Sequence, residues 1–338
     1  MTVMTNNGSI DGVDVAGLLG IPISAEQERA VRAPLDPCVV IAGAGTGKTT
    51  VMAARVVWLV ASGLVSPEEI LGLTFTNKAT MELSERIESN LTRVGLLKPD
   101  QPRPTVATYD SFAGTLVGDY GAWDGINTGA HLMTGARAYQ LASEVVVGLD
   151  KAPLAATHLG PTPIAQAVVK LAAAMASHDA SPDEVRKADA RWRQMLLDAP
   201  TKKGGGRYAD IDTWLSRVDE REEFLELVAA YQELKKERGL VEFGDRMVQA
   251  LHLVTHHPRV GEELRARYRV VLLDEYQDTS SAQADVLAAL FSGPDSSHGM
   301  GHPVMAVGDP LQAIYEWRGA AASNILEFHR RFPDKEWN

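Results

Sequence analysis

Cysteine is nearly absent from this sequence of 338 residues, in which Cys38 stands alone. A single thiol excludes an internal disulfide and a cluster of thiolate metal ligands, so we expect Cys38 to be a small buried hydrophobic residue. Long hydrophobic runs are also lacking, which argues against a membrane-spanning helix. The N-terminal stretch carries Asp11 and Asp14 and has no basic segment of the kind that begins a secretion signal. These absences predict a cytoplasmic protein.

Positive charge is also in short supply, because 33 Lys and Arg residues face 44 Asp and Glu residues and the formal net charge is −11. This balance argues against a uniformly basic nucleic-acid-binding protein, although only the local potential matters in a groove. Within residues 186–207, however, only Asp189 and Asp198 oppose a basic cluster. The cluster consists of Arg186, Lys187, Arg191, Arg193, Lys202, Lys203 and Arg207. Two interpretations stay open: a solvated helix face with a loop, or a surface that contacts nucleic-acid backbone.

Small residues gather at positions 42–47, directly after the β-branched residues 39–41, and a helix-like segment follows from about Thr50 to Ala61. Small side chains let successive backbone N–H groups curve around a phosphate. The first turn of the helix directs its positive dipole end at the same anion. Strand, glycine-rich loop and helix in this order predict a phosphate-binding loop, although Ala42 stands where the strict pattern has its first glycine.

Several residues of this loop and its surroundings are expected to bind a nucleoside triphosphate with Mg²⁺. In the loop they are Gly43, Ala44, Gly45, Thr46, Gly47, Lys48, Thr49 and Thr50. Lys48 would reach the β- and γ-phosphates, and the Thr49 hydroxyl would hold Mg²⁺. Upstream, Ser24 begins a helix with Gln27 in its first turn. The amide of Gln27 carries both a donor and an acceptor, which suits adenine, but the same side chain also fits an ordinary helix surface.

A second candidate half of the site follows the apolar residues 270–273, which predict a buried strand that delivers Asp274 and Glu275 at its carboxyl end. Ligands of open α/β sheets bind at that end of the strands. An aspartate there would hold Mg²⁺, and the next carboxylate would orient and deprotonate the attacking water. Two acids after a strand are weak evidence alone, but together with the phosphate loop they indicate an NTPase.

The order of the predicted elements indicates an α/β fold with a parallel sheet covered on both faces, because strands alternate with helices. The expected strands are residues 39–41, 70–76, 105–108, 270–273 and 304–307. From 121 to 240 the periodicity is helical, with no convincing strand, so we expect a mainly helical insertion. The expected organisation is a poorly ordered lead-in (1–20), an ATP-binding domain in two pieces (21–120 and 241–338) and the insertion (121–240).

Five segments resemble the conserved motifs of the UvrD/Rep/PcrA group of superfamily 1 DNA helicases. Residues 42–49 are similar to their motif I, 73–79 to motif Ia, 274–280 to motif II and 307–320 to motif III, and Gln27 stands at the place of the Q motif. The segments occur in the order of the family and span about 300 residues, so chance agreement is remote. Residues 51–61 and 109–121 further resemble the helicase subunits of actinobacterial AdnAB-type helicase–nucleases.

The resemblance implies a RecA-like P-loop NTPase fold and assigns roles to the ATP-site residues. It implies that the loop residues bind ATP, that Asp274 holds Mg²⁺ and that Glu275 is the catalytic base. Gln312 would sense the γ-phosphate and couple it to the DNA site, and Gln27 would recognise adenine. Lys48, Asp274, Glu275 and Gln312 are thus the predicted catalytic residues.

On the DNA side, single strands are held by aromatic platforms beside cationic and polar contacts to the backbone. The resemblance implies that Phe75, Tyr315 and Trp317 contact bases and that Arg318 supports them, although aromatic residues more often fill a core. The full predicted set is Phe75, Thr76, Asn77, Thr108, Ser111, Tyr315, Trp317 and Arg318. Two residues depart from the family pattern: Asp110 replaces a histidine of motif Ib, and Glu316 stands where arginine is common.

Motifs IV to VI, which belong to a second motor domain, do not occur in these residues. The resemblance therefore predicts the ATP-binding half of a 3′→5′ DNA helicase or translocase of repair or recombination, acting on single-stranded DNA or a duplex junction. We expect this half alone to bind ATP weakly and not to unwind DNA, because transition-state arginines contribute strongly to the rate. An alternative is a non-enzymatic ATP- and DNA-binding subunit that depends on a partner motor, and a helicase–nuclease partner subunit is a further expectation.

A GTPase is disfavoured because Asn77-Lys78 is followed by Ala79-Thr80 and not by the guanine-reading aspartate.

Overall fold

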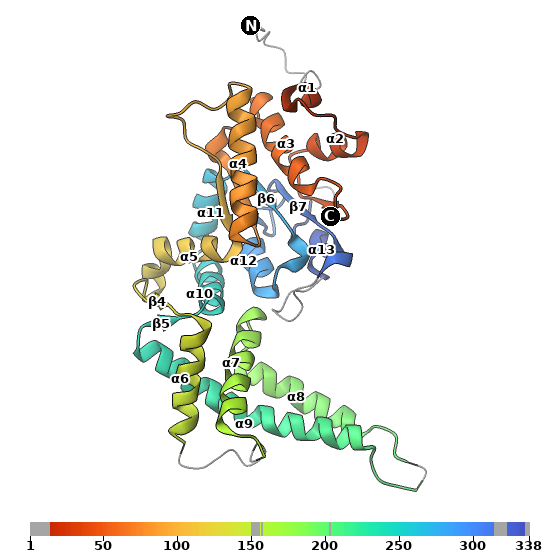
Figure 1. Cartoon of the computed structure of the whole chain (residues 1–338), viewed down its shortest axis with the longest axis vertical. Coiled ribbons are helices and arrows are strands. Elements are labelled where there is room, and N and C mark those ends of the chain that lie inside the picture. Colours follow the sequence, from red (N-terminus) through yellow and green to blue (C-terminus); the bar gives the residue numbers. More distant parts are fainter. Residues whose placement is uncertain (1–13, 150–155, 157, 203, 314–322, 335–338) are drawn as a thin grey trace. The chain divides into compact units, whose positions relative to one another are not determined.

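The computed structural model describes residues 14–149, 156, 158–202, 204–313 and 323–334. The chain forms two compact units (Figure 1). Unit 1 combines Met1–Thr115 with Leu251–Asn338, and unit 2 is Leu116–Ala250. Two helices, α5 (Tyr109–Tyr120) and α10 (Phe243–His256), cross the limits between the units. Within the described part of the chain, no helix is long and apolar enough to cross a bilayer.

Unit 1 is organised around a five-stranded parallel sheet with the strand order β1–β7–β6–β2–β3. The strands are β1 (Cys38–Ile41), β2 (Ile70–Thr74), β3 (Thr105–Thr108), β6 (Val270–Leu273) and β7 (Val304–Gly308). Every residue of β2, β6 and β7 is buried, as parallel strands covered on both faces require. The predicted α/β fold with a parallel sheet is confirmed. β2 ends at Thr74, two residues before its predicted end, because Thr76 caps the next helix.

The helices of unit 1 cover the sheet and carry the loops at its edges. They are α1 (Val15–Leu19), α2 (Ala25–Val31), α3 (Lys48–Ala61), α4 (Asn77–Arg93), α11 (Pro258–Arg267), α12 (Ser281–Phe291), α13 (Ser323–Leu326) and α14 (Phe328–Arg331), with the 3₁₀ turns η2 (Pro67–Glu69), η4 (Tyr276–Asp278) and η5 (Pro310–Gln312). Apolar residues of α3 and α4 pack against Val270, Leu272, Met305 and Val307 of the sheet. This core fixes the start of α3, and with it the phosphate loop.

The prediction of a poorly ordered lead-in is wrong for residues 15–19, which form α1. Asp14 caps this helix through its side chain, and Gly20 ends it in a left-handed conformation. Val15 and Leu19 are buried in the same core as α3. A short helix of this kind is stabilised by tertiary packing and not by its own propensity, so the local sequence does not reveal it.

Arg55 of α3 ties α2 to the rest of unit 1, although its side chain is buried. Its guanidinium donates to the carbonyl oxygens of Val31 (3.0 Å), Ala33 (2.8 Å) and Pro34 (2.9 Å) at the end of α2. These acceptors are carbonyl groups that a helix end leaves without intrahelical partners. The interaction therefore gives both terminal nitrogens of the buried guanidinium and the end of α2 hydrogen-bond partners, and it holds α2 beside the phosphate loop.

Unit 2 is mainly helical. Its described residues include the 3₁₀ turn η3 (Gly121–Asp124) and the helices α6 (Gly135–Val147), α7 (Pro161–Ser177), α8 (Pro182–Leu197) and α9 (Ala209–Glu237). It also contains β4 (His131–Leu132) and β5 (Leu240–Val241), which pair in parallel. The prediction that this region has no strand is wrong in that detail, because two-residue strands are too short for periodicity to reveal. The apolar core joins α6, α7 and α9, whereas α8 lies along α9 outside that core.

A buried lysine connects α9 to the segment after β5. The Lys235 ammonium, 2% exposed, lies 2.9 Å from Glu242 and 2.7 Å from Asp245. The Tyr231 hydroxyl donates to the same Glu242 carboxylate over 3.0 Å. The Lys235 ammonium thus has two carboxylate partners, which is what makes a buried charge tolerable.

Candidate nucleotide-binding site

Three loops follow adjacent strands of unit 1 and meet at one edge of the sheet. The phosphate loop follows β1, Asp274 follows β6 and Asp309 follows β7, which lies between the other two strands. Because the strands are parallel, their carboxyl ends lie together at the edge where open α/β sheets bind ligands. A direct contact joins the two predicted halves of the site: Lys48 Nζ lies 2.9 Å from Glu275 Oε2, although the residues are 227 positions apart.

The phosphate loop depends on two glycines with positive φ. Gly45 has a φ of 74° and Gly47 a φ of 86°, a conformation that residues with a Cβ rarely adopt. Thr46 closes the turn, because its hydroxyl donates to the Gly43 carbonyl over 2.8 Å. Gly47 is also the N-cap of α3 and offers no side-chain acceptor to the first N–H groups of that helix. Those N–H groups are suited to bind a phosphate.

Lys48 and the two acids after β6 form a partly buried charged cluster. The Lys48 side chain is 10% exposed and that of Glu275 is 34% exposed. Asp274 is buried, and this burial raises its pKa to about 6; the charge of Glu275 raises the pKa further and Lys48 opposes the shift. Glu275 has a φ of 47°, which is uncommon for a residue other than glycine. Such backbone strain is concentrated at functional sites, where surrounding contacts maintain it.

The donor set at this edge fits Mg²⁺ bound together with a nucleotide. Asp274 supplies carboxylate oxygens, and Thr49, partly buried at the start of α3, supplies a hydroxyl. Mg²⁺ is usually held by one or two carboxylates, water and substrate phosphates. Among the described residues, no group of three or more His, Cys, Asp and Glu is placed to hold a metal. One carboxylate and one hydroxyl leave most positions around Mg²⁺ to water and phosphate oxygens, so this donor set suits an ion that the nucleotide helps to bind; the roles of Thr49 and Asp274 stay predictions.

Gln277 is a site residue that was not predicted from the sequence. Its buried amide donates to Glu275 Oε2 over 2.8 Å and accepts from the backbone N–H of Asp309 over 3.0 Å. A Cβ added to Gly308 would lie 2.1 Å from the Gln277 amide oxygen, so Gly308 is what lets the amide reach β7. Gln277 thus fixes the Glu275 carboxylate and joins the loops that follow β6 and β7. The only signal in the sequence is an amide placed between acids just after a buried strand.

Gln312, the predicted γ-phosphate sensor, lies in η5 after β7. Its amide donates to the Asp309 carboxylate, and the backbone N–H of Leu311 donates to the same carboxylate over 2.9 Å. These two hydrogen bonds, the one from Gln312 first, lower the pKa of Asp309. Through Asp309 and Gln277, Gln312 is connected to Glu275 by hydrogen bonds alone. Its role as a sensor stays a prediction.

Gln27 takes part in a capping box at the start of α2. Its amide oxygen accepts from the Ser24 N–H over 2.9 Å, and its backbone N–H donates to the Ser24 hydroxyl over 3.2 Å. The amide nitrogen donates to the Thr46 carbonyl in the phosphate loop over 2.9 Å. The structure therefore places Gln27 against the loop, and adenine recognition by it stays a prediction.

Thr50 and the exposed Ala44 complete the predicted nucleotide-binding set. The Thr50 hydroxyl accepts a hydrogen bond of 2.8 Å from the Arg86 guanidinium on α4. Ala44 lies in the phosphate loop with its side chain toward solvent. Arg86 was not predicted as a site residue, because its place beside the loop follows from the packing of α3 against α4.

Five of the eight residues predicted to contact DNA lie at or after the ends of β2 and β3, which are neighbours on the side of the sheet away from β1. Thr76 and Asn77 are exposed at the start of α4, and Phe75 before them is partly buried. The Ser111 N–H donates to the Thr108 hydroxyl over 3.0 Å at the start of α5. Tyr315, Trp317 and Arg318 lie outside the described residues.

The segment after β3 also contacts Asp274, the residue that follows β6. The buried Tyr109 hydroxyl donates to the Asp274 carbonyl over 2.9 Å. Asp110, which replaces the histidine of the family pattern, accepts a hydrogen bond of 3.0 Å from the Gln283 amide. Asp110 thus has a structural partner on α12, and the predicted DNA residues Thr108 and Ser111 flank a hydrogen bond to Asp274.

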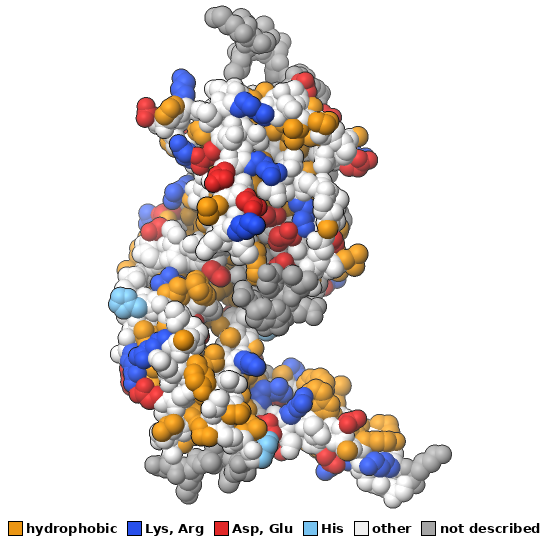
Figure 2. Space-filling view, in the orientation of Figure 1, with side chains coloured by type: hydrophobic (Ala, Val, Ile, Leu, Met, Phe, Trp, Pro, Cys, Tyr) orange, Lys and Arg blue, Asp and Glu red, His pale blue; other side chains and the backbone are white. Residues whose placement is uncertain are grey.

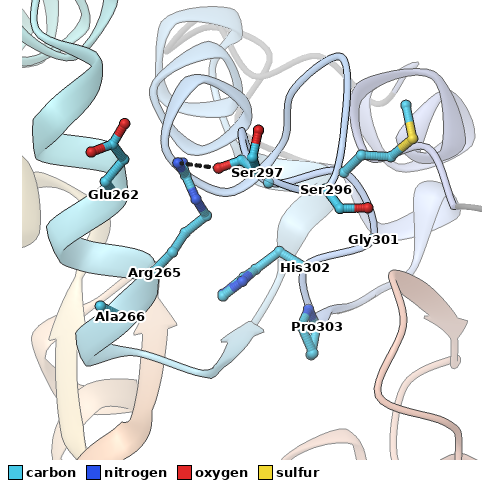
Figure 3. Close-up of a pocket in the computed structure, with 10 residues that line it drawn as sticks. Glu262, Arg265, Ala266, Ser296, Ser297, Gly301, His302 and Pro303 are labelled. Atoms are coloured by element: carbon cyan, nitrogen blue, oxygen red, sulfur yellow. Dashed lines mark hydrogen bonds between the residues drawn. The ribbon is translucent and has the colours of Figure 1, made fainter.

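A hollow of about 400 Å³ opens elsewhere on unit 1 (Figure 3). Its lining includes Arg265, which donates to the Ser297 carbonyl over 3.5 Å, and His302, whose Nε2 lies 2.9 Å from the Tyr268 carbonyl. Burial lowers the pKa of His302 to about 4, so this ring is neutral at pH 7. His302 precedes β7, so the hollow lies at the amino ends of the strands and is separate from the phosphate loop.

The parallel sheet, the phosphate loop and the paired acids at its edge define a P-loop NTPase with a RecA-like motor fold. The chain belongs to the UvrD/Rep helicase family: the family profile described as the UvrD/REP helicase N-terminal domain matches residues 23–333.

Curated relatives agree with this family. The chain is 30% identical over 330 residues to DNA helicase II of Escherichia coli K12, covering 96% of this chain and 38% of the relative. It is 29% identical over 336 residues to the ATP-dependent DNA helicase UvrD1 of Mycobacterium tuberculosis H37Rv, covering 99% of this chain and 39% of the relative. It is 28% identical over 316 residues to DNA helicase II of Rickettsia typhi, covering 92% of this chain and 40% of the relative. The chain thus spans about two-fifths of the length of these relatives.

Proposed function

We propose that this chain is the ATP-binding half of a 3′→5′ DNA helicase or translocase that couples ATP hydrolysis to movement on single-stranded DNA. The observation that carries the proposal is the 2.9 Å contact between Lys48 and Glu275 beside the buried Asp274. A triphosphate-binding lysine and a candidate catalytic base belong to one site, as hydrolysis requires. The relatives are named as DNA helicases, which favours DNA over other polymers as the track.

In the proposed reaction, the Glu275 carboxylate accepts the proton of the water that attacks the γ-phosphate. Glu275 Oε2 contacts both Lys48 and Gln277. When Lys48 turns to the β- and γ-phosphates, Gln277 continues to orient the carboxylate, which is then free to accept a proton. Mg²⁺, held by Thr49 and Asp274, would neutralise charge on the β- and γ-phosphate oxygens.

Coupling to DNA would run through the hydrogen bonds that join the loops after β6, β7 and β3. Gln312 contacts Asp309, Gln277 joins Asp309 to Glu275, and Tyr109 contacts the Asp274 carbonyl. A change at the γ-phosphate would therefore reach the segment that holds Thr108 and Ser111. Phe75, Tyr315 and Trp317 would supply stacking surfaces for bases, with Thr76, Asn77 and Arg318 beside them.

In this proposal, unit 1 is the first motor domain and unit 2 is its helical insertion. Because the chain spans about two-fifths of its relatives, we expect it to require the arginines of a second motor domain for efficient turnover. The 338 residues alone would bind ATP weakly and would not separate strands. Work in repair or recombination, and a helicase–nuclease partner of the AdnAB type, stay predictions of the sequence resemblance.

The proposal is tested by DNA-stimulated ATP hydrolysis in a polypeptide that continues through a second motor domain. Lys48→Ala should reduce the DNA-stimulated rate at least a thousandfold, because the ammonium that neutralises the triphosphate is lost. Lys98→Ala, an exposed lysine far along the chain from the loop, should leave the rate unchanged. Tight DNA binding without ATP hydrolysis in the parent protein would instead support a binding subunit that depends on a partner motor.

A further inference from the structure

Large apolar side chains are exposed together at one end of the α8–α9 hairpin in unit 2. Figure 2 shows hydrophobic and basic side chains gathered over these helices. Trp192 is 52% exposed and Trp214 is 48% exposed, one on each helix. The apolar residues exposed with them are Met195, Leu197 and Tyr208. Burying so much aromatic surface on a partner would be favourable, and exposed patches of this kind commonly mark interaction sites.

The two indole rings form a tilted pair whose spacing is close to that of two rings with one base stacked between them. Their centroids are 6.3 Å apart and their planes are inclined by 34°. A base stacked between two rings needs a separation of about 6.8 Å, which is two stacking steps of about 3.4 Å. A small change of side-chain angle would therefore admit one base. Stacking on aromatic side chains is the principal way in which proteins hold single-stranded nucleic acids without reading their sequence.

Cations accompany both exposed aromatic groups. The Arg217 guanidinium lies 4.9 Å from the ring centroid of Trp214, and the Lys202 ammonium lies 5.7 Å from that of Tyr208. Such contacts keep the cation beside the ring while its charge still faces water. A phosphate next to a stacked base would find a positive partner at each place.

The charge of the segment favours an anionic partner. Residues 186–217 contain eight Lys and Arg against four Asp and Glu, in a chain whose net charge is −11. Three of the basic residues are engaged by carboxylates: Arg186 with Glu222, Arg193 with Asp219 and Arg207 with Asp212. The basic residues therefore partly hold the hairpin together, and when their partners Asp219 and Glu222 are counted with this segment, the local excess of positive charge falls to two. An acidic protein would satisfy the charge, but the ring spacing specifically suits a planar base.

We propose that Trp192 and Trp214 form a second site for single-stranded nucleic acid, in which a base stacks between or against the indoles and Arg217 and Lys202 contact the flanking phosphates. All of its residues belong to unit 2, whereas the predicted DNA contacts at the ends of β2 and β3 belong to unit 1. It goes beyond the proposed motor function, because it requires neither ATP nor Lys48.

Photocrosslinking tests the site locally. The whole chain would be irradiated with an oligothymidine in which 5-iodouracil replaces some bases, and the adducts would be mapped by mass spectrometry. We expect adducts on Trp192 or Trp214, both in the parent chain and in Lys48→Ala. Adducts confined to unit 1 would overturn the proposal and leave the motor assignment untouched.

Equilibrium binding of a fluorescent oligothymidine tests the contribution of stacking. Trp192→Leu with Trp214→Leu should weaken binding about tenfold, whereas Trp192→Phe with Trp214→Phe should retain most of it, because phenyl rings still stack. Val147→Ala, an exposed apolar residue on α6 that is not part of this surface, is the matched control and should bind normally. Unchanged affinity in the leucine variant would overturn the proposal. So would self-association of the parent chain in sedimentation that the leucine variant loses, because this surface would then serve a second copy of the chain.

Discussion

Opposite charges meet in two different ways in this molecule. At the sheet edge of unit 1, Lys48 and Glu275 form a contact with the lysine 10% exposed, and Asp274 beside them is buried. Between α8 and α9 in unit 2, Arg193 and Asp219 pair with side chains that are 41% and 51% exposed. The first pair is largely withdrawn from water, whereas the second remains hydrated. Electrostatic interactions are far stronger in the first environment.

The difference indicates what each place is suited to do. Charges removed from water are costly to hold, and such groups are expected where they act on a substrate. Hydrated pairs contribute little energy, so the α8–α9 pairs can align two helices while leaving the aromatic surface above them exposed. Unit 2 also has its own buried cation, Lys235, which allows the effect of burial to be separated from the effect of function.

Glu275→Gln should have the largest effect, because it removes the negative charge from the partly buried pair at the sheet edge of unit 1. The amide keeps the size of the side chain but cannot accept the proton of the attacking water. We expect the DNA-stimulated ATPase rate of the extended protein to fall by about 10²- to 10⁴-fold. Binding of a fluorescent ATP analogue should persist, because Lys48 is retained and loses its anionic partner. Retention of the parental rate would exclude Glu275 as the base.

Lys235→Met tests how much a buried ion pair contributes to stability at a place outside the proposed catalytic site. The change leaves the carboxylates of Glu242 and Asp245 without their cation, and it should lower the free energy of unfolding by about 3 kcal/mol. Lys236→Met on the exposed neighbour is the control and should have little effect. The measurement is urea unfolding followed by circular dichroism. Equal stability of the two variants would mean that burial does not govern the energy of this pair.

Asp274→Asn should increase stability while it impairs Mg²⁺-dependent hydrolysis. The folded-state pKa of Asp274 is raised to about 6, so the folded form holds this proton more tightly than the unfolded form. The resulting penalty is absent below about pH 4, grows as the pH rises to 6 and is complete above that, where it amounts to about 3 kcal/mol. Unfolding curves at pH 4 and pH 7 should show the variant's advantage at pH 7 only. An advantage at pH 4 would contradict this origin.

The smallest effect is expected for the hydrated pair between α8 and α9. A double-mutant cycle with Arg193→Gln and Asp219→Asn should give a coupling energy below about 1 kcal/mol. Raising the salt concentration should reduce it further. A coupling as large as the effect of Lys235→Met would remove the distinction between buried and hydrated pairs.

Much of the sheet and of the phosphate loop was predictable, because both are encoded by residues close in sequence. The strands 105–108 and 270–273 begin and end as predicted, since β-branched and apolar residues fill them and polar residues bound them. Two-residue strands such as β4, and the short helix α1, were missed. Their stability comes from partners far along the chain, and they are too short to show a period.

The connections within the site were less predictable, because they depend on which loops meet in space. Gln277 has a role only because Asp309 and Glu275 lie on either side of its amide. The basic cluster at 186–207 likewise gave no sign that Arg186 and Arg193 face acids of α9, which follow in a later segment. Residue type predicted the chemistry of these groups, and only the fold supplied their partners.

The hydrogen bond from the Gln27 amide to the Thr46 carbonyl has a consequence for how the enzyme would tell one nucleotide from another. If this amide turns to bind adenine, the Thr46 carbonyl of the proposed phosphate-binding loop loses its hydrogen bond. Binding of the purine would then change the contacts of the loop that is proposed to bind the phosphates. Inorganic tripolyphosphate has no purine, so the hydrogen bond between Gln27 and Thr46 would remain. The tripolyphosphate would therefore bind to a loop that Gln27 still holds.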